Sequence, residues 1–242
     1  MIDPLNQFKI KQLVPIEFCG MDFSLTNATA FMLLSVFVVA TVMILGTKLQ
    51  KDEKPSRFNA FIEMIYEFIS NMIRDNCGTE GLRFLPFVLS LFMFVAIGNL
   101  LGMLPYSFTF TSHIISTFTL AAIVFIFVTV LGFVRHGTKY LGIFLPGGAP
   151  IFLAPILIPI ELISYLTRPI SLSVRLFANM MAGHMVLKIF ASFVVLLGIA
   201  GGVVPLVMTV IITLFELFVA LIQAYIFSIL TCVYLHDALH VH

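Results

Sequence analysis

Six residues that can carry charge lie in a part of the chain that is otherwise almost entirely apolar. Residues 144–235 form a largely hydrophobic stretch that contains Glu161, Arg168, Arg175, His184, Lys188 and Glu216. A charge at the centre of a membrane helix costs about 2.5–3.5 kcal/mol on insertion scales, so such residues usually serve a function and have a partner. In a membrane interior without bulk water, carboxylate and imidazole groups can relay a proton, and a guanidinium group can repel one.

The spacing of these residues predicts two polar stripes. Glu161, Arg168 and Arg175 are seven residues apart, which is nearly two helical turns, and Asn179 follows one turn later. Glu216 and Gln223 are also seven apart. We therefore expect two long helices, each with polar residues along one side.

Structural explanations remain open for most of these residues. Arg168 and Lys188 could extend to a membrane interface, and His184 could be a core histidine bonded to a backbone carbonyl. Glu161 and Glu216 could simply pair with the arginines. Arg175 is hardest to explain in this way, because it lies mid-helix with only Asn179 as a polar neighbour.

The composition indicates the class of protein that holds these residues. Of 242 residues, 60% are hydrophobic and 10% are charged, far from the balance of a soluble domain. A net charge of +1 argues against nucleic-acid binding, which needs a basic surface. The three cysteines form no CxxC pair, and no nucleotide-binding or HExxH motif is present. We expect neither a metal nor a cofactor.

The hydropathy pattern predicts an all-α polytopic membrane protein. Apolar runs long enough to cross a bilayer core of about 30 Å place five spans in one membrane domain, residues 28–242, after an external lead, residues 1–27. An amphipathic helix over about 58–76 is too polar to span and is expected on the inner surface. The last two spans are longer than a perpendicular crossing needs, so we expect them to be tilted. The predicted spans are about 28–46, 84–103, 114–134, 151–197 and 203–235.

Basic residues set the expected orientation. Lys48, Lys51, Lys54 and Arg57 follow the first span, whereas the loop 105–113 has no lysine or arginine. Basic loops stay on the inner side of the membrane, so the N-terminus is expected outside.

Four segments resemble subunit a (subunit 6) of the F-type ATP synthase. They are residues 98–105 (GNLLGMLP), 161–169 (ELISYLTRP), 171–184 (SLSVRLFANMMAGH) and 221–227 (LIQAYIF). The resemblance implies a non-catalytic stator subunit that conducts protons past a rotating ring of c subunits, beside peripheral-stalk b-type subunits and the rest of the complex. It implies a bacterial or mitochondrial inner membrane.

The same resemblance assigns roles to six residues. Arg175 matches the family's essential arginine facing the ring, with Asn179 and Gln223 as polar neighbours. His184 and Glu216 match the pair of the proton uptake path, in the arrangement typical of mitochondria and their bacterial relatives. Glu161 matches the acid of the release path, to which Asp237 could also belong. The rival interpretation is a secondary transporter or ion channel, but such transporters usually contain repeated halves, and this chain shows none.

Overall fold

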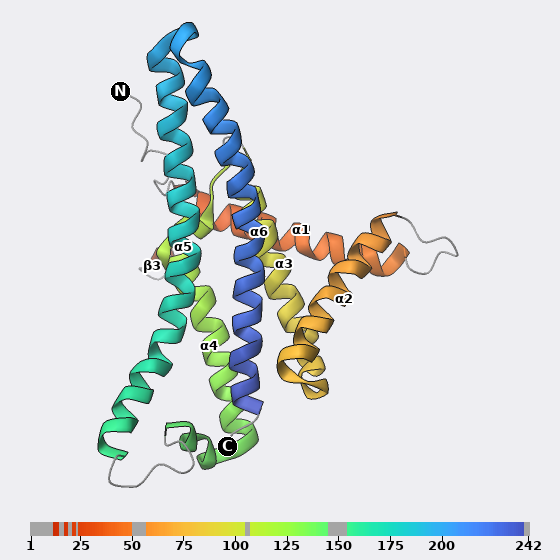
Figure 1. Ribbon diagram of the computed structural model, residues 1–242. Helices are drawn as coiled ribbons and strands as arrows, with labels where there is room; N and C mark the ends of the chain where they lie inside the picture. Colours follow the sequence, from red (N-terminus) through yellow and green to blue (C-terminus); the bar gives the residue numbers. More distant parts are fainter. Residues whose placement is uncertain are drawn as a thin grey trace.

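The computed structural model describes residues 12–14, 17–18, 21–22, 24–49, 57–104, 107–144 and 154–239. These residues form an all-α bundle with a small β-structured lead (Figure 1). The helices are α1 (Asn27–Leu49), α2 (Arg57–Cys77), α3 (Leu85–Gly102), α4 (Ile114–His136), α5 (Ala154–Gly201) and α6 (Val203–Leu239), joined in places by the 3-10 helices η2 (Thr79–Phe84), η3 (Phe110–Ser112) and η4 (Gly137–Phe144).

Five of these elements are long and apolar enough to cross a membrane. They cover Asn27–Gly46, Thr79–Gly102, Ile114–Ile143, Ala154–Gly198 and Val203–Leu239, close to the five predicted spans. The predicted fold class is therefore confirmed: the chain is an integral, multi-pass membrane protein. The first residues of the fourth predicted span, 151–153, lie outside the described residues.

The lead contains short strands that the hydropathy pattern did not predict. Strand β1 (Gln12–Val14) pairs antiparallel with β4 (Leu25–Thr26), and β2 (Glu17–Phe18) pairs antiparallel with β3 (Met21–Asp22). Polar leads can still pair backbone groups in this way without an apolar core. The external position of the lead stays a prediction.

Helices α5 and α6 form a long hairpin that dominates the molecule (Figure 1). The turn depends on glycine: Gly198 has φ 63°, and a Cβ at Gly202 would lie 2.6 Å from the carbonyl oxygen of Gly198. Up to Gly198, helix α5 has 45 residues, and α6 has 37, or about 68 and 55 Å, so a hairpin held within the bilayer must lie strongly tilted. Helix α5 also contains Pro159 and Pro169, and its first part bends away from α6.

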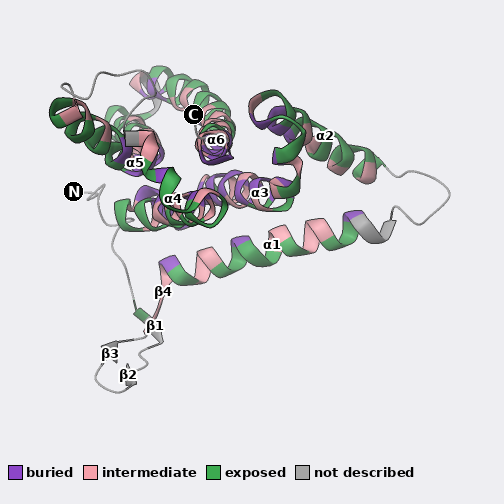
Figure 2. Ribbon diagram, turned by 90° about the horizontal axis from the view of Figure 1, so that it is seen from below, coloured by how far each residue is buried: buried purple, intermediate pink, exposed green. Residues whose placement is uncertain are grey.

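The core lies where α3, α4 and the middle of the hairpin meet. Leu172 and Leu176 of α5 pack with Ala224 and Phe227 of α6 and with residues of α3 and α4. Figure 2 shows these inward faces as buried, whereas the outer faces are exposed. The exposed faces carry many large apolar side chains, as expected for surfaces that meet lipid or a partner subunit.

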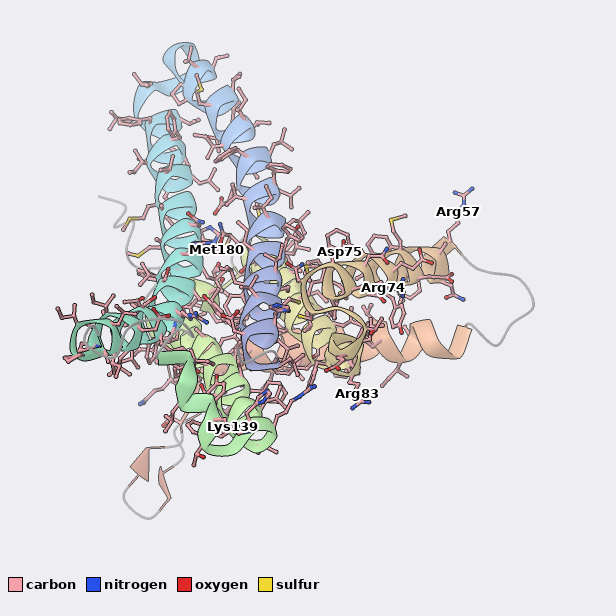
Figure 3. All side chains as sticks on the ribbon, turned by 60° about the horizontal axis from the view of Figure 1, so that its bottom comes forward. Arg57, Arg74, Asp75, Arg83, Lys139 and Met180 are labelled. Carbon is pink, nitrogen blue, oxygen red and sulfur yellow. The ribbon has the colours of Figure 1, made fainter. Side chains whose placement is uncertain are left out.

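The predicted amphipathic helix is present as α2. Its apolar side chains Ile69, Met72 and Ile73 are buried against α3 and α6. Arg57 and Arg74 are exposed on α2, as is Lys139 on η4 (Figure 3). Lys51 and Lys54 of the predicted basic loop lie outside the described residues, and the position of α2 on the inner membrane surface stays a prediction.

Candidate functional site

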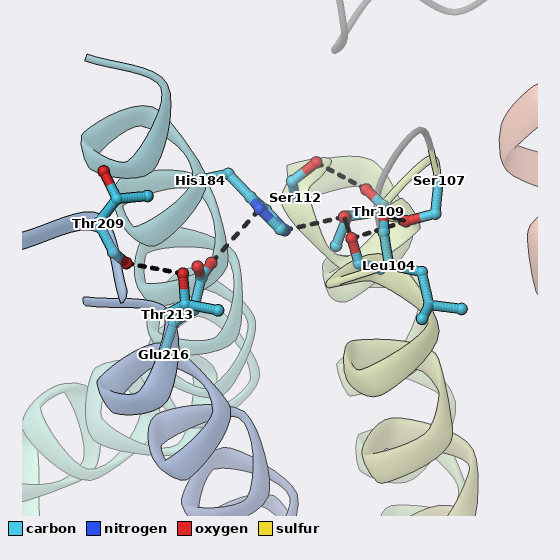
Figure 4. A network of polar contacts seen from close by, with 9 residues as sticks. Leu104, Ser107, Thr109, Ser112, His184, Thr209, Thr213 and Glu216 are labelled. Atoms are coloured by element: carbon cyan, nitrogen blue, oxygen red, sulfur yellow. Dashed lines mark hydrogen bonds and ion pairs between the residues drawn. The ribbon is translucent and has the colours of Figure 1, made fainter. Parts of the chain in front are cut away.

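The hairpin brings together His184 and Glu216, two residues predicted to share one path. Nδ1 of His184 on α5 lies 3.4 Å from Oε1 of Glu216 on α6 (Figure 4). Their side chains are only 8% and 3% exposed. The contact is within ion-pair distance, but no hydrogen bond from the described residues reaches either carboxylate oxygen of Glu216. A buried acid and imidazole in loose contact can exchange a proton without first breaking a tight network.

A glycine allows this close approach of the two helices. A Cβ at Gly183 would lie 2.5 Å from Oε1 and 2.8 Å from Cδ of Glu216. Any larger side chain at this position would therefore displace the carboxylate. The Ala-Gly-His sequence of residues 182–184 thus places the imidazole and makes room for its partner at adjacent positions.

A third element contacts the pair from the loop between α3 and α4. Oγ1 of Thr109 lies 2.9 Å from Nε2 of His184 and donates a hydrogen bond of 2.9 Å to the carbonyl oxygen of Gly102. The hydroxyl of Ser107 donates to the same carbonyl oxygen of Gly102, and the hydroxyl of Ser112 donates to the carbonyl oxygen of Thr109 (Figure 4). We define this outer cluster as His184, Glu216 and Thr109.

The loop adds no permanent charge to the outer cluster. His113 begins the turn into α4 and stacks on Phe108, with ring centroids 5.0 Å apart. Burial lowers the pKa of His113, so its imidazole is neutral at neutral pH.

Arg175 lies on the opposite, open side of α5. It is exposed, whereas the neighbouring Leu172 and Leu176 are buried. No ion pair joins Arg175 to another described residue. Asn179, one turn further along α5, is half-buried, and Gln223 on α6 is buried. A guanidinium that is open on a membrane helix is costly unless it has a partner.

Arg168 does not simply extend toward an interface. Its Nη1 lies 2.7 Å from Oδ2 of Asp237, and its guanidinium carbon lies 5.4 and 5.2 Å from the ring centroids of Tyr165 and Tyr234. We define these four residues as the inner cluster. The ion pair joins α5 to the end of α6, and the structural partner of this arginine is Asp237 rather than Glu161 or Glu216.

The predicted stripe on α5 therefore divides among three environments. Arg168 pairs with α6 and Arg175 is exposed, while Glu161 is half-buried near the start of α5 without an ion pair to any described residue. Pro169, which lies between Glu161 and Arg175, lacks the backbone N–H of a regular helical bond at that point of α5.

Sequence reasoning missed Thr109 and the part that Asn99 plays. Nδ2 of Asn99 donates a 3.1 Å hydrogen bond to the carbonyl oxygen of Ala220, which links α3 to α6 one turn from Glu216. The sequence feature that could have indicated Thr109 is the composition of its loop. The loop lacks lysine and arginine but has hydroxyl residues at positions 107, 109, 111 and 112. The absence of charge in this loop indicates topology, whereas its hydroxyl groups indicate a polar surface.

These features define a class: a polytopic membrane protein with a buried acid–imidazole pair and an open arginine on one tilted hairpin. Comparison of the sequence with known protein families identifies the family within this class. The model of the family "ATP synthase A chain" matches residues 29–236, which is most of the chain. The protein belongs to this family.

Similar proteins cover the full length of the chain. ATP synthase subunit a of Rhodospirillum rubrum is 54% identical over 242 residues, covering all of both chains. The subunit of Paramagnetospirillum magneticum is 52% identical over 248 residues, again covering all of both chains. That of Parvibaculum lavamentivorans is 50% identical over 245 residues, covering 99% of this chain and 94% of its own. The resemblance to subunit a of the F-type ATP synthase is thereby confirmed.

Proposed function

We propose that this chain is the proton-translocating stator subunit of an F-type ATP synthase, with Arg175 facing a rotating ring of c subunits. The observation that carries the proposal is the position of Arg175, which is exposed on α5 between the buried outer cluster and the inner cluster. It lies nine residues from His184 and seven from Arg168, or about 13 and 10 Å along a helix.

The surface around Arg175 supports a close-fitting partner. Ser171, Ala178 and Ala182 are exposed and lie on the same side of α5 as Arg175. Small residues let another membrane helix approach closely, so a cation placed among them can reach an acid on that helix. A ring of hairpin subunits, each with a carboxyl group in mid-membrane, fits this surface.

The chemistry of arginine explains its role against such a ring. A guanidinium stays protonated at any accessible pH, even when it is desolvated. A ring carboxyl in lipid keeps its proton, but beside Arg175 the ionised form becomes favourable and the proton leaves. The same positive charge repels a proton that would cross directly from one path to the other.

We assign the uptake path to His184 and Glu216, and the release path to Glu161. Asn179 and Gln223 act as polar neighbours of Arg175, between the two paths. Each proton that crosses the membrane down the potential releases about 2.3 kcal/mol per 100 mV, so several are needed for each ATP. The chain itself makes and breaks no bond other than those to protons.

The proposed setting is a bacterial inner membrane, because the three relatives named above come from bacteria. There the chain would contact the c-subunit ring and peripheral-stalk b-type subunits. Co-purification with a ring of small hairpin proteins separates this function from that of an independent transporter or channel.

The decisive experiment is Arg175→Ala in the assembled complex. We expect ATP-driven acidification of inverted vesicles and proton-driven ATP synthesis both to be lost, while the subunit stays in the complex. Arg175→Lys should fail as well, because a desolvated lysine can lose its proton and has no planar fork. Vesicles with Arg175→Ala that still acidified on addition of ATP would overturn the proposal.

A further inference from the structure

Within the outer cluster, Thr109 contacts His184 in a way that bears on which ring nitrogen carries a hydrogen. Its hydroxyl is 2.9 Å from the carbonyl oxygen of Gly102 and 2.9 Å from Nε2 of His184 (Figure 4). The threonine is 3% exposed. It comes from the loop between α3 and α4, an element that the assignment of the uptake path to α5 and α6 did not include.

The single hydrogen of the Thr109 hydroxyl links the directions of its two hydrogen bonds. A hydroxyl has one hydrogen to donate, and a carbonyl oxygen can only accept. In the arrangement in which Thr109 donates to Gly102, whose carbonyl oxygen also accepts from Ser107, the oxygen of Thr109 accepts from His184. It follows that Nε2 of His184 carries a hydrogen in both the neutral and the charged form of the ring.

This arrangement makes Nδ1 the nitrogen that gains and loses a proton. Nδ1 faces Oε1 of Glu216 at 3.4 Å. When the ring is neutral, Nδ1 presents a lone pair, so the contact is favourable only if Glu216 carries a proton. When Glu216 is ionised, the proton lies on Nδ1 instead. The pair then shares one proton across this contact, and Glu216 passes it on.

We propose that Thr109 is a positioning residue of the uptake path, which holds His184 in the Nε2–H form so that Nδ1 exchanges a proton with Glu216. The inference rests on the proposed function and adds a third element to its uptake path. Other ionisable groups do not supply the same constraint: Lys188 lies one turn along α5, and His113 in the loop is neutral and stacks on Phe108.

Gly102 offers an independent way to move the same hydroxyl. A Cβ at Gly102 would lie 2.5 Å from Cγ2 and 2.6 Å from Oγ1 of Thr109. The end of α3 thus lacks a side chain at the point where the threonine sits. Gly102→Ala keeps the hydroxyl in the protein but pushes it from its place.

The test compares Thr109→Val, Thr109→Ser and Thr111→Val in the full complex, by the rate of ATP-driven acidification of inverted vesicles. Thr109→Val keeps the shape but leaves the buried Nε2–H without an acceptor, so we expect a loss of roughly tenfold. Thr109→Ser keeps the hydroxyl and should restore most of the rate. Thr111→Val is the matched control, because Thr111 is 1% exposed and its hydroxyl bonds to no described residue.

Two results would overturn the inference. One is a parental rate for Thr109→Val in a complex that assembles normally. The other is a Thr109→Ser rate as low as that of Thr109→Val, because a role in packing alone would depend on the methyl group. If Thr109→Val does not assemble, Gly102→Ala decides: a slow but assembled complex supports the inference, and a parental rate contradicts it.

The outcome is distinguishable from failure of the proposed function. If Arg175→Ala stops proton flow while Thr109→Val does not, only the role of Thr109 is wrong. If Arg175→Ala leaves proton pumping intact, the proposed function itself fails, whatever Thr109 does.

Discussion

The outer and inner clusters are both contacts between an acid and a base that join α5 to α6, but they are built differently. In the outer cluster the two groups are nearly fully buried and 3.4 Å apart. In the inner cluster Arg168 and Asp237 are 2.7 Å apart and 23% and 38% exposed. Glu216 and Asp237 are 21 residues apart on α6, or about 31 Å, close to the thickness of a bilayer core of about 30 Å.

The difference separates a contact suited to proton exchange from one suited to holding helices together. Imidazole and carboxyl can each take or release a proton near neutral pH when their surroundings favour it, and Glu216 accepts no hydrogen bond from the described residues. A guanidinium keeps its charge, so Arg168 places a fixed positive charge 2.7 Å from the carboxylate of Asp237, and Tyr165 and Tyr234 flank the pair. If this comparison is right, mutations in the two clusters should differ in kind.

The largest effect is expected at the outer cluster. Glu216→Gln keeps the shape but removes the exchangeable proton, so proton flow should fall on the order of tenfold or more without loss of assembly. The double exchange His184→Glu with Glu216→His keeps one acid and one imidazole, so it should conduct better than either single change. ATP-driven acidification of inverted vesicles measures all four proteins.

One outcome of the double exchange would contradict the proposed difference between the outer and inner clusters. If the double variant conducts as poorly as the worse single variant, His184 and Glu216 do not act as a pair. The uptake path must then follow other residues, and the loose contact seen between the two helices is incidental. Quantification of the subunit in each membrane preparation controls for assembly.

A smaller effect is expected when the contact is displaced but its chemistry is kept. An alanine at position 183 would push the carboxylate of Glu216 away from His184, since its Cβ would lie 2.5 Å from Oε1. We expect a loss of several-fold in the same acidification assay, because misplacing a proton donor is costly even when the group is present.

Gly142→Ala is the matched control for this prediction, because a Cβ at Gly142 meets no atom within 4 Å. It should conduct at the parental rate. A parental rate for Gly183→Ala as well would mean that Glu216 can reorient freely, and that the close approach of α5 and α6 at this point does not set proton flow.

The sequence predicted the helices and most of the outer cluster for clear physical reasons. Apolar runs of sufficient length specify spans whatever their packing, and the expense of burying Arg175, His184 and Glu216 marks them as unusual. Hydropathy could not predict the ion pair between Arg168 and Asp237. Asp237 lies at the polar end of α6, where an acidic residue is common and does not indicate a contact. Thr109 was missed since a hydroxyl in a loop is common and only the fold brings it to His184.

The smallest effect is expected at the inner cluster. Asp237→Asn makes the same change, from carboxylate to amide, as Glu216→Gln does in the outer cluster. The amide oxygen can still accept from Arg168, and an ion pair this exposed contributes only about 0–1 kcal/mol. We therefore expect proton flow to stay close to the parental rate, with at most a slight loss of thermal stability of the complex.

The two amide variants together decide between the roles of the clusters. A large loss for Glu216→Gln beside a near-parental rate for Asp237→Asn is the pattern of one exchanging contact and one structural contact. If Asp237→Asn instead slowed acidification as much as Glu216→Gln, Asp237 would itself carry protons. The ion pair with Arg168 would then be one state of a release path, because a carboxylate that must be protonated in each cycle cannot also serve as a permanent tie between α5 and α6.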